Sequence, residues 1–414
     1  MHNASTAPVP SGTPLSAAAR DYCRRLLADV EHAAQPTAPV TTTTCDERWR
    51  QCGLDRLTGL PAQPVERCPL PLACYADGAL AAFRELAATP LPYGGGGAEL
   101  LTLRATLTAL RARGSISPGG SCRLLRTRDG VIALNLAREG DWRLLDAWLL
   151  QSVPHNWNAI AERVTRCDSA VLVEQGRLLG LAVADAGTVD EQPAHWVERS
   201  QHGAPVRDGG RAPVVVDLSS LWAGPLCSRL LQWAGARVIK VESSTRVDGA
   251  RNGSRAFFDF LNRDKEALQL DLACPAGREQ LGALIDTADI VIEGSRPRAL
   301  RQMGICAESL LPARPGLSWI SITGHGRSEP QANWIAYGDD AGVAAGLSAL
   351  LHRATGRWLV CGDAIADPLT GLHAAVAALY SWRAGGGHLV SLSLAQTVRH
   401  CIAFAGRGDA PCPA

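Results

Sequence analysis

One stretch of the chain, residues 213–240, constrains the fold more than any other. It opens on three consecutive valines at 214–216, and a short apolar run bounded by polar residues indicates a strand buried on both faces. Leucines then recur at helical spacing as far as Trp233, and Gly235 is placed to end that helix. A second apolar run follows at 237–240. Strand, helix and strand within about thirty residues predict a right-handed βαβ unit, the start of a parallel sheet.

The same alternation continues through the C-terminal half. Strands are expected at the end of 257–272 and over 289–293, 317–323 and 388–394, with helices at 275–288 and 367–382. Strands that alternate with helices favour an α/β fold. We therefore predict a doubly wound, parallel, Rossmann-like sheet over 213–400.

The N-terminal half has a different pattern. Residues 1–44 are expected to form a disordered or helical arm, with the Pro-rich residues 1–15 disordered. A smaller α+β domain is predicted over 45–185, because an Asp-Gly turn between two apolar runs indicates a β-hairpin at 121–137. The polar segment 186–212 lacks periodicity and is predicted to be a linker between the two domains.

Composition excludes several classes of function. The net charge is +1 with acids and bases nearly balanced, so no nucleic-acid or membrane-surface partner is expected. No apolar run approaches the ~20 residues of a membrane span, and the N-terminus lacks the pattern of a secretory signal. None of the 13 cysteines forms a CxxC pair, which favours buried thiols in a reducing compartment over zinc ligands. We expect a soluble, cytoplasmic protein without a metal.

Six segments of the C-terminal half follow one another in a recognisable order: VVVDLSSLWAGPLCSRLLQWAGARVIKVE, FLNRDKEALQLDL, ADIVIEGSRPRAL, ISITGHG, AYGDD and GDAIADPLTGL. Together they resemble the class III CoA-transferases, the formyl-CoA and carnitine CoA-transferase type, over roughly 212–394. That superfamily also contains the α-methylacyl-CoA racemases. The resemblance implies that coenzyme A is bound as part of an acyl-CoA substrate. NAD and ATP are disfavoured because no GxGxxG or GxxxxGK[ST] motif follows a strand.

The N-terminal half resembles other parts of the same family, placed in an unusual order. Residues 121–182 are similar to the family's small domain, which normally follows the Rossmann half. Residues 45–59 loosely resemble the loop after the catalytic aspartate. The chain is therefore either permuted or the product of a fusion. The resemblance also implies a homodimer, possibly with interlocked chains.

The resemblance assigns chemistry to a few carboxylates. Asp340 matches the family's catalytic aspartate, the nucleophile that attacks the thioester, and Asp339 stands where the racemases carry a catalytic His. Asp367 matches the second base of the racemases, although Asp followed by Pro is also ideal for capping a helix. Asp363 is a fallback for that role. His325, between two glycines at a strand end, is either a base or a turn residue.

Further residues match the segments that bind the nucleotide part of CoA. Glycine in a turn lets the backbone approach a cofactor closely, and basic side chains at strand-to-helix turns suit phosphates. A solvated surface is the alternative for the charged ones. The candidates are Ala223, Gly224, Pro225, Asn262, Arg263, Lys265, Arg296 and Arg298.

These features predict an enzyme that moves CoA between carboxylic acids through an aspartyl intermediate. A racemase or isomerase of α-methylacyl-CoA is the alternative within the superfamily, and a non-catalytic protein that binds acyl-CoA or a partner is the alternative outside it. A serine hydrolase is disfavoured because the chain lacks a GxSxG motif.

Overall fold

A seven-stranded sheet forms the centre of the C-terminal half in this computed structural model, which describes residues 14–67, 69–87, 89–189, 194–206 and 210–407. Most of the segment expected to be disordered, 1–13, lies outside the described residues. The strands of the sheet are β6 (Glu198–Gln201), β7 (Val214–Leu218), β8 (Arg237–Ser243), β9 (Glu266–Leu270), β10 (Ile290–Glu293), β11 (Ser318–Thr323) and β12 (His388–Ser393).

The strand order is β6-β12-β11-β10-β7-β8-β9, and every neighbouring pair is parallel except β12 with β6. The chain passes from β7 outward to β8 and β9, then returns to the other side of β7 to form β10, β11 and β12. The order therefore reverses between β7 and β10, which creates the crevice where ligands bind in open α/β sheets. The predicted doubly wound sheet is confirmed.

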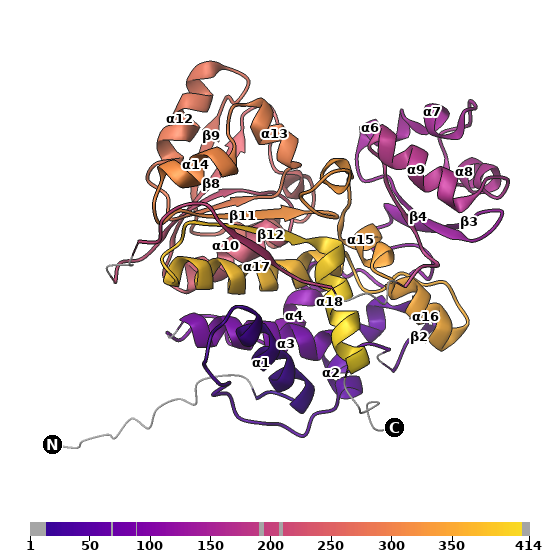
Figure 1. Cartoon of the computed structure of the whole chain (residues 1–414). Coiled ribbons are helices and arrows are strands. Elements are labelled where there is room, and N and C mark those ends of the chain that lie inside the picture. The colour runs from indigo at the N-terminus through magenta and orange to yellow at the C-terminus, as the bar shows by residue number, and fades with distance from the viewer. Residues whose placement is uncertain (1–13, 68, 88, 190–193, 207–209, 408–414) are drawn as a thin grey trace.

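Helices cover both faces of this sheet (Figure 1). One face carries α12 (Pro275–Ile285), α13 (Pro297–Gln302) and α14 (Ala307–Ala313), and the first two begin on a proline, which suits the first turn of a helix. The other face carries α10 (Ala223–Trp233) and α17 (Ala366–Arg383), which pack against each other. Further helices in this half are α11 (Arg255–Asn262), α15 (Gly338–Ala344), α16 (Leu347–Thr355) and α18 (Leu394–Arg407).

Helix α17 is apolar on all sides, and nearly all of its residues are buried. A helix of that composition needs partners around its whole circumference. The sheet and α10 cover one side, and helix α3 of the N-terminal half covers the opposite side (Figure 1). The N-terminal helices therefore complete the core of the C-terminal half; they are α1 (Ala17–Asp29), α2 (Cys45–Cys52), α3 (Leu72–Ala87), α4 (Gly97–Leu101) and α5 (Leu103–Thr108).

A small three-stranded sheet confirms the predicted hairpin (Figure 1). Strands β3 (Cys122–Arg126) and β4 (Val131–Asn135) are antiparallel, and β5 (Ala182–Asp185), which the sequence analysis did not anticipate, pairs with β4. Strands β4 and β5 contact α15. The helices of this domain are α6 (Glu139–Trp142), α7 (Leu145–Leu149), α8 (Trp157–Val164) and α9 (Ser169–Leu179).

The segment 186–212 is not only a linker, because strand β6 lies within it and pairs with β12 at the edge of the large sheet. All four residues of β6 are exposed, so its sequence carries no alternation of apolar and polar residues. That absence explains why periodicity did not reveal the strand. Among the described residues, no helix has the length and apolarity needed to cross a membrane.

We predict opposite effects for two glycine-to-alanine changes. A Cβ at Gly371 in α17 would lie 2.7 Å from the carbonyl oxygen of Ala223 in α10, so Gly371→Ala should lower the free energy of unfolding by about 1–3 kcal/mol. A Cβ at Gly282 in α12 meets nothing within 4 Å, so Gly282→Ala should raise it by about 0.5–1 kcal/mol. Urea denaturation midpoints measure both, and equal shifts would contradict the tight α10–α17 contact.

Candidate active site

Four aspartates gather where α15 and α17 begin. Asp339 and Asp340 lie in the first turn of α15, Asp367 lies in the first turn of α17, and Asp363 lies in the loop just before it. The amides at a helix N-terminus favour negative charge. The structure therefore brings together all the carboxylates to which the sequence assigned chemistry.

Two hydrogen bonds tie the two helix starts to each other. The amide of Gly338 donates to Asp367 Oδ2 at 3.0 Å, and the amide of Ala364 donates to Asp339 Oδ1 at 2.7 Å. Each carboxylate thus accepts a hydrogen bond from a backbone amide near the start of the other helix. A Cβ at Gly338 would lie 2.4 Å from Asp367 Oδ2, so only glycine permits this approach. The positions of Asp339 and Asp367 are consequently coupled.

Two residues of the N-terminal half reach this cluster. Arg104, just inside α5, donates to both oxygens of Asp363 at 2.8 and 2.6 Å. Asn135, at the end of β4, donates to Asp340 Oδ1 at 2.8 Å, and the amide of Tyr337 donates to the same oxygen at 3.0 Å. Both halves of the chain therefore contribute to one carboxylate site. Sequence patterns did not reveal Arg104 or Asn135, because they lie 259 and 205 residues from their partners.

Burial dominates the electrostatics of the cluster. The side chains of Asp340 and Asp363 are 0% exposed and that of Asp339 is 5% exposed, whereas Asp367 keeps some accessible surface. Desolvation disfavours the charged form and raises the pKa of Asp340 and of Asp367 to about 7. Burial and the neighbouring charge of Asp363 raise the pKa of Asp339 to about 6. These groups therefore titrate near neutral pH.

Asp340 and Asp367, the two carboxyl groups with the highest pKa, differ in which oxygen lacks a hydrogen bond. Asp340 Oδ2 has no hydrogen-bond partner among the described residues, but that atom is buried. In Asp367, Oδ2 accepts from Gly338, and no hydrogen bond within the described part of the chain reaches Oδ1. Since Asp367 is partly exposed, it is the carboxylate of the cluster best placed to meet a molecule from solution.

His325 lies apart from the aspartates. Its ring packs edge-to-face against Trp334 with centroids 5.5 Å apart, and among the described residues no hydrogen bond joins it to the carboxylates. Burial and the charges of Arg177 and Arg399 lower the pKa of His325 to about 3. The imidazole is therefore neutral at physiological pH. These contacts favour a packing role over that of a base.

The turn at Ala223, Gly224 and Pro225 follows β7 at the switch point, and all three residues are buried as the first turn of α10. A Cβ at Gly224 would lie 2.1 Å from Ser219 Oγ, so this glycine is needed for the turn itself. The three residues shape the crevice between β7 and β10, while their own side chains are covered.

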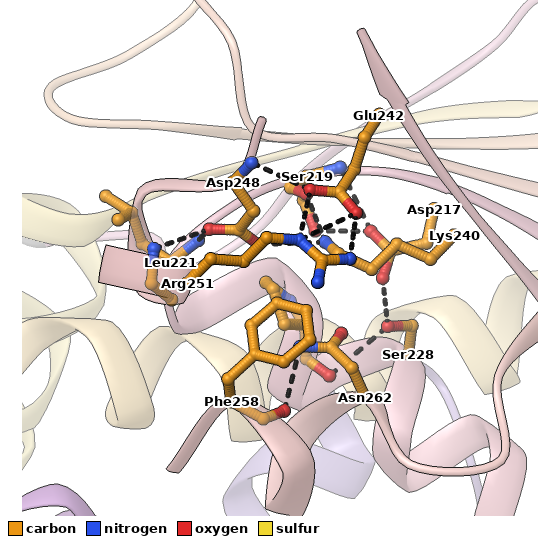
Figure 2. Close-up of polar contacts among 12 residues, drawn as sticks. Asp217, Ser219, Leu221, Ser228, Lys240, Glu242, Asp248, Arg251, Phe258 and Asn262 are labelled. Atoms are coloured by element: carbon orange, nitrogen blue, oxygen red, sulfur yellow. Dashed lines mark hydrogen bonds and ion pairs between the residues drawn. The ribbon is translucent and has the colours of Figure 1, made fainter. Parts of the chain in front are cut away.

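A buried network of charges holds the loop that leads into this turn (Figure 2). Lys240 donates to the carbonyl of Ser219 at 2.9 Å and pairs with Asp248 at 2.9 Å. Asp248 in turn accepts from the amide of Leu221 at 2.9 Å, and Asp217 accepts from the amide of Ser219 at 3.0 Å. The loop after β7 is therefore fixed by side chains of β7, β8 and the segment that follows β8.

Lys265 belongs to the same network, which corrects its expected role. Its ammonium contacts Asp217, Ser228, Asn262 Oδ1 and the carbonyl of Pro225, and its side chain is 1% exposed. An ammonium has three donors, and these acceptors use all of them. Lys265 therefore stabilises the turn internally and is not available to a phosphate, and Asn262 shares this structural role.

Arginines of three segments gather beside Tyr337, the residue just before α15, and one of them, Arg138, is paired with Asp141. Arg296, at the start of α13, is half-buried, and burial together with the charges of Arg298, Arg138 and Arg246 lowers its pKa. Arg138 comes from the small domain and Arg246 from the segment after β8. The sequence pattern indicated Arg296 and Arg298, but no motif pointed to Arg138 or Arg246. Arg263 is exposed and does not join this group.

A cavity of about 740 Å³ lies elsewhere, between α9 and the segment that follows β11. The guanidinium of Arg177 sits over the ring of Trp334 there, 3.9 Å from its centroid. None of the four aspartates lines this cavity. Within the described residues, no group of three or more His, Cys, Asp or Glu is arranged to hold a metal ion.

Comparison with known families agrees with this geometry. Residues 213–406 match the family model described as CoA-transferase family III. This half of the chain is similar to CoA-transferase family III. The matched range contains the sheet, the four aspartates and all six segments that carried the resemblance, so the resemblance is confirmed.

Curated relatives extend the match to named enzymes. The formyl-CoA:oxalate CoA-transferases of Escherichia coli and Shigella boydii are each 32% identical over 195 residues, which cover 44% of this chain and 47% of the relative. The chain therefore spans about half the length of the curated relatives it matches. One similar solved structure is a hypothetical protein from Mycobacterium tuberculosis, with 26% identity, a TM-score of 0.43 and coverage of 49% of this chain and 59% of that chain. Another is a CAIB/BAIF family protein from Brucella suis, with 28% identity, a TM-score of 0.39 and coverage of 49% of this chain and 58% of that chain.

We predict that the buried carboxyls of this site make the free energy of unfolding fall as pH rises. Their raised pKa values mean that the folded state binds more protons than the unfolded state above pH ~4, so the stabilisation is complete at low pH and is lost as pH rises through ~7. Each such group contributes a slope of up to about 1.4 kcal/mol per pH unit. Urea denaturation of the wild type and Asp340→Asn between pH 5 and 7 should show a shallower slope for the variant.

Asp264→Asn serves as the control, because Asp264 is 74% exposed and asparagine tolerates its positive φ of 65°. This variant should keep the wild-type slope. Parallel curves for the wild type and Asp340→Asn would mean that Asp340 is ionised throughout this range.

Proposed function

We propose that this chain is a CoA-transferase that moves CoA between carboxylic acids through an aspartyl intermediate. The family match over residues 213–406 supports the class of substrate, and the cluster of desolvated carboxylates supports the chemistry. The observation that carries the proposal is the partly exposed Asp367, one oxygen of which is held by a backbone amide.

Accessibility favours Asp367 as the nucleophile over Asp340, the residue that the sequence favoured. Asp340 is 0% exposed, and its Oδ1 accepts from Asn135 and from the amide of Tyr337 at the start of α15. A side chain in that position anchors the helix and the small domain. Asp367 Oδ1, by contrast, has no competing hydrogen bond within the described residues. We assign the attack to Asp367 Oδ1 and a positioning role to Asp340.

The reaction needs an ionised nucleophile and returns it unchanged. Asp367 attacks the thioester carbonyl, the C–S bond breaks, and an acyl-aspartyl anhydride and CoA thiolate result. The thiolate then attacks the aspartyl carbonyl, which releases the first acid and leaves an aspartyl-CoA thioester. An acceptor carboxylate repeats both steps in reverse and regenerates the Asp367 carboxylate. A dry site helps because a carboxylate without its hydration shell is a better nucleophile.

The arginine surface is the proposed site for the phosphates of CoA. Arg296 and Arg298 lie at the start of α13, directly after β10, and therefore at the switch point of the sheet. A guanidinium group can donate two parallel hydrogen bonds to two oxygens of one phosphate. Arg246 adds charge from the segment after β8, whereas the charge of Arg138 is shared with Asp141. The surface adjoins Tyr337 and hence α15, and this proximity to the carboxylates supports the proposed phosphate site.

Trapping should identify the nucleophile. Incubation of the wild type with formyl-CoA and hydroxylamine should convert Asp367 to a hydroxamate, located by peptide mass spectrometry. Asp367→Asn should lose transfer to oxalate by at least ~10³-fold, because the amide cannot form the anhydride. Asp340→Asn should keep the hydroxamate at 367 with reduced activity. Modification at Asp340 instead of Asp367 would restore the assignment that the sequence favoured.

A second activity, exchange of the α-proton of an acyl-CoA, is favoured by one observation: Asp340 and Asp367 both have a pKa near 7, which suits proton transfer. Incubation with 2-methylacyl-CoA in D₂O distinguishes the two activities. Deuterium at the α-carbon without an aspartyl adduct supports a racemase. Tight binding of CoA with neither event supports a non-catalytic protein.

The arginine surface generates a separate prediction. Arg296→Gln should raise KM for acyl-CoA by about 10- to 100-fold while kcat changes little, because a lost hydrogen bond to a charged phosphate is worth ~1.5–3 kcal/mol. Arg278→Gln on α12 is the control, since its guanidinium contacts backbone carbonyls near the start of that helix. Initial rates over a range of acyl-CoA concentrations give both constants. A fall in kcat alone would place Arg296 at the reaction centre instead.

A further inference from the structure

Two cysteine sulfurs meet in the N-terminal half, away from the carboxylate cluster. The Sγ atoms of Cys45 and Cys74 lie 3.4 Å apart and share a thiol–thiol hydrogen bond. Cys45 is the first residue of α2, and Cys74 lies in the first turn of α3. A disulfide has an S–S distance of about 2.05 Å, so the two atoms need to approach by only about 1.4 Å.

Both thiols lie where a thiolate is stabilised. Helix N-termini favour negative charge, and each cysteine lies at one. The hydrogen bond with Cys45, followed by one from Ser16, lowers the pKa of the Cys74 thiol despite its burial. In contrast, burial raises the pKa of Cys52, at the other end of α2, to about 12. The pair therefore differs chemically from the inert thiols of the core.

Exposure gives the two cysteines different parts in an exchange reaction. Cys45 is partly exposed, whereas Cys74 is 0% exposed. A small molecule in solution therefore meets Cys45 first. Cys74 lies behind it, within contact distance of the sulfur that such a molecule would modify. This is the arrangement of an attacking and a resolving thiol.

We propose that Cys45 and Cys74 form a reversible disulfide by exchange with a low-molecular-weight disulfide such as oxidised glutathione. The Cys45 thiolate attacks one sulfur of the reagent, the S–S bond breaks, and one glutathione thiolate leaves. The Cys74 thiolate then attacks Cys45 Sγ and releases the second glutathione. Two protein thiols and one oxidised reagent thus give one protein disulfide and two reduced thiols, with two electrons transferred in total.

The bond would reinforce a contact that ion pairs already make. Arg48 of α2 donates to Asp77 of α3 at 2.5 and 3.0 Å and to Glu99 of α4 at 2.6 Å. Helix α4 leads directly into α5, whose Arg104 holds Asp363. A covalent link between α2 and α3 therefore stiffens the platform that positions Arg104. Since the link closes a 29-residue loop, it should also stabilise the folded chain.

Peptide mapping of the native full-length protein tests the proposal. The protein is incubated with oxidised glutathione, remaining thiols are blocked with N-ethylmaleimide, and trypsin digestion is followed by mass spectrometry. The expected product links peptide 26–48, which contains Cys45, to peptide 68–84, which contains Cys74 and also Cys68. Dithiothreitol should reverse it. Tm should rise on oxidation of the wild type and stay constant for Cys45→Ser.

Four variants make the outcome decisive. Cys45→Ser and Cys74→Ala should each abolish the linked peptide. Cys68→Ser should keep it, which removes the ambiguity of the shared tryptic peptide, and Cys274→Ser should keep it while preserving the helix cap that Cys274 provides. A link that survives in Cys74→Ala, or a stable glutathione adduct on Cys45 without a link, would overturn the proposal. So would oxidation seen only under denaturing conditions.

Discussion

The burial of α17 is the constraint on which the rest of the structure depends. Most residues of this helix are buried, so the sheet and α10 cover only part of its surface, and α3 and α18 cover other parts. Once α3 is docked, α4 and α5 follow along the chain and bring Arg104 to Asp363 at the start of α17. The packing of one hydrophobic helix therefore determines where a distant arginine meets the carboxylate site.

The same burial sets the chemistry of that site. Four carboxyl groups lie in a volume from which water is largely excluded, and Arg104 supplies the guanidinium that pairs with one of them. Burial disfavours the charged forms most strongly, and the neighbouring carboxylates add repulsion, so the pKa values of Asp339, Asp340 and Asp367 rise towards neutrality. The site therefore holds protons near pH 7 and leaves one carboxylate, that of Asp367, partly exposed.

Local sequence patterns predicted the parts of this architecture that arise from local physics. The valines at 214–216, the Asp-Gly turn at 129–130 and the prolines at helix starts each specify one element, and the βαβ unit and the hairpin are confirmed. Contacts between distant segments could not be predicted this way. From the sequence, Lys265 is expected to be a charged surface residue. In the structure its ammonium is buried because it donates a hydrogen bond to Asp217, 48 residues earlier in the chain. Strand β6 was not predicted for a different reason. All four of its residues are exposed, so its sequence shows no alternation of apolar and polar residues.

The order of the two halves along the chain follows from these contacts. Asn135 reaches Asp340 from the small domain, and Arg104 reaches Asp363 from the helical layer, both within a single chain. Neither contact requires the small domain to follow the Rossmann half in sequence, because each needs only the right position in space. The connection between the halves contributes β6 to the edge of the large sheet, so this connection is itself attached to the C-terminal domain. A rearranged chain can therefore present a carboxylate site to which both halves contribute.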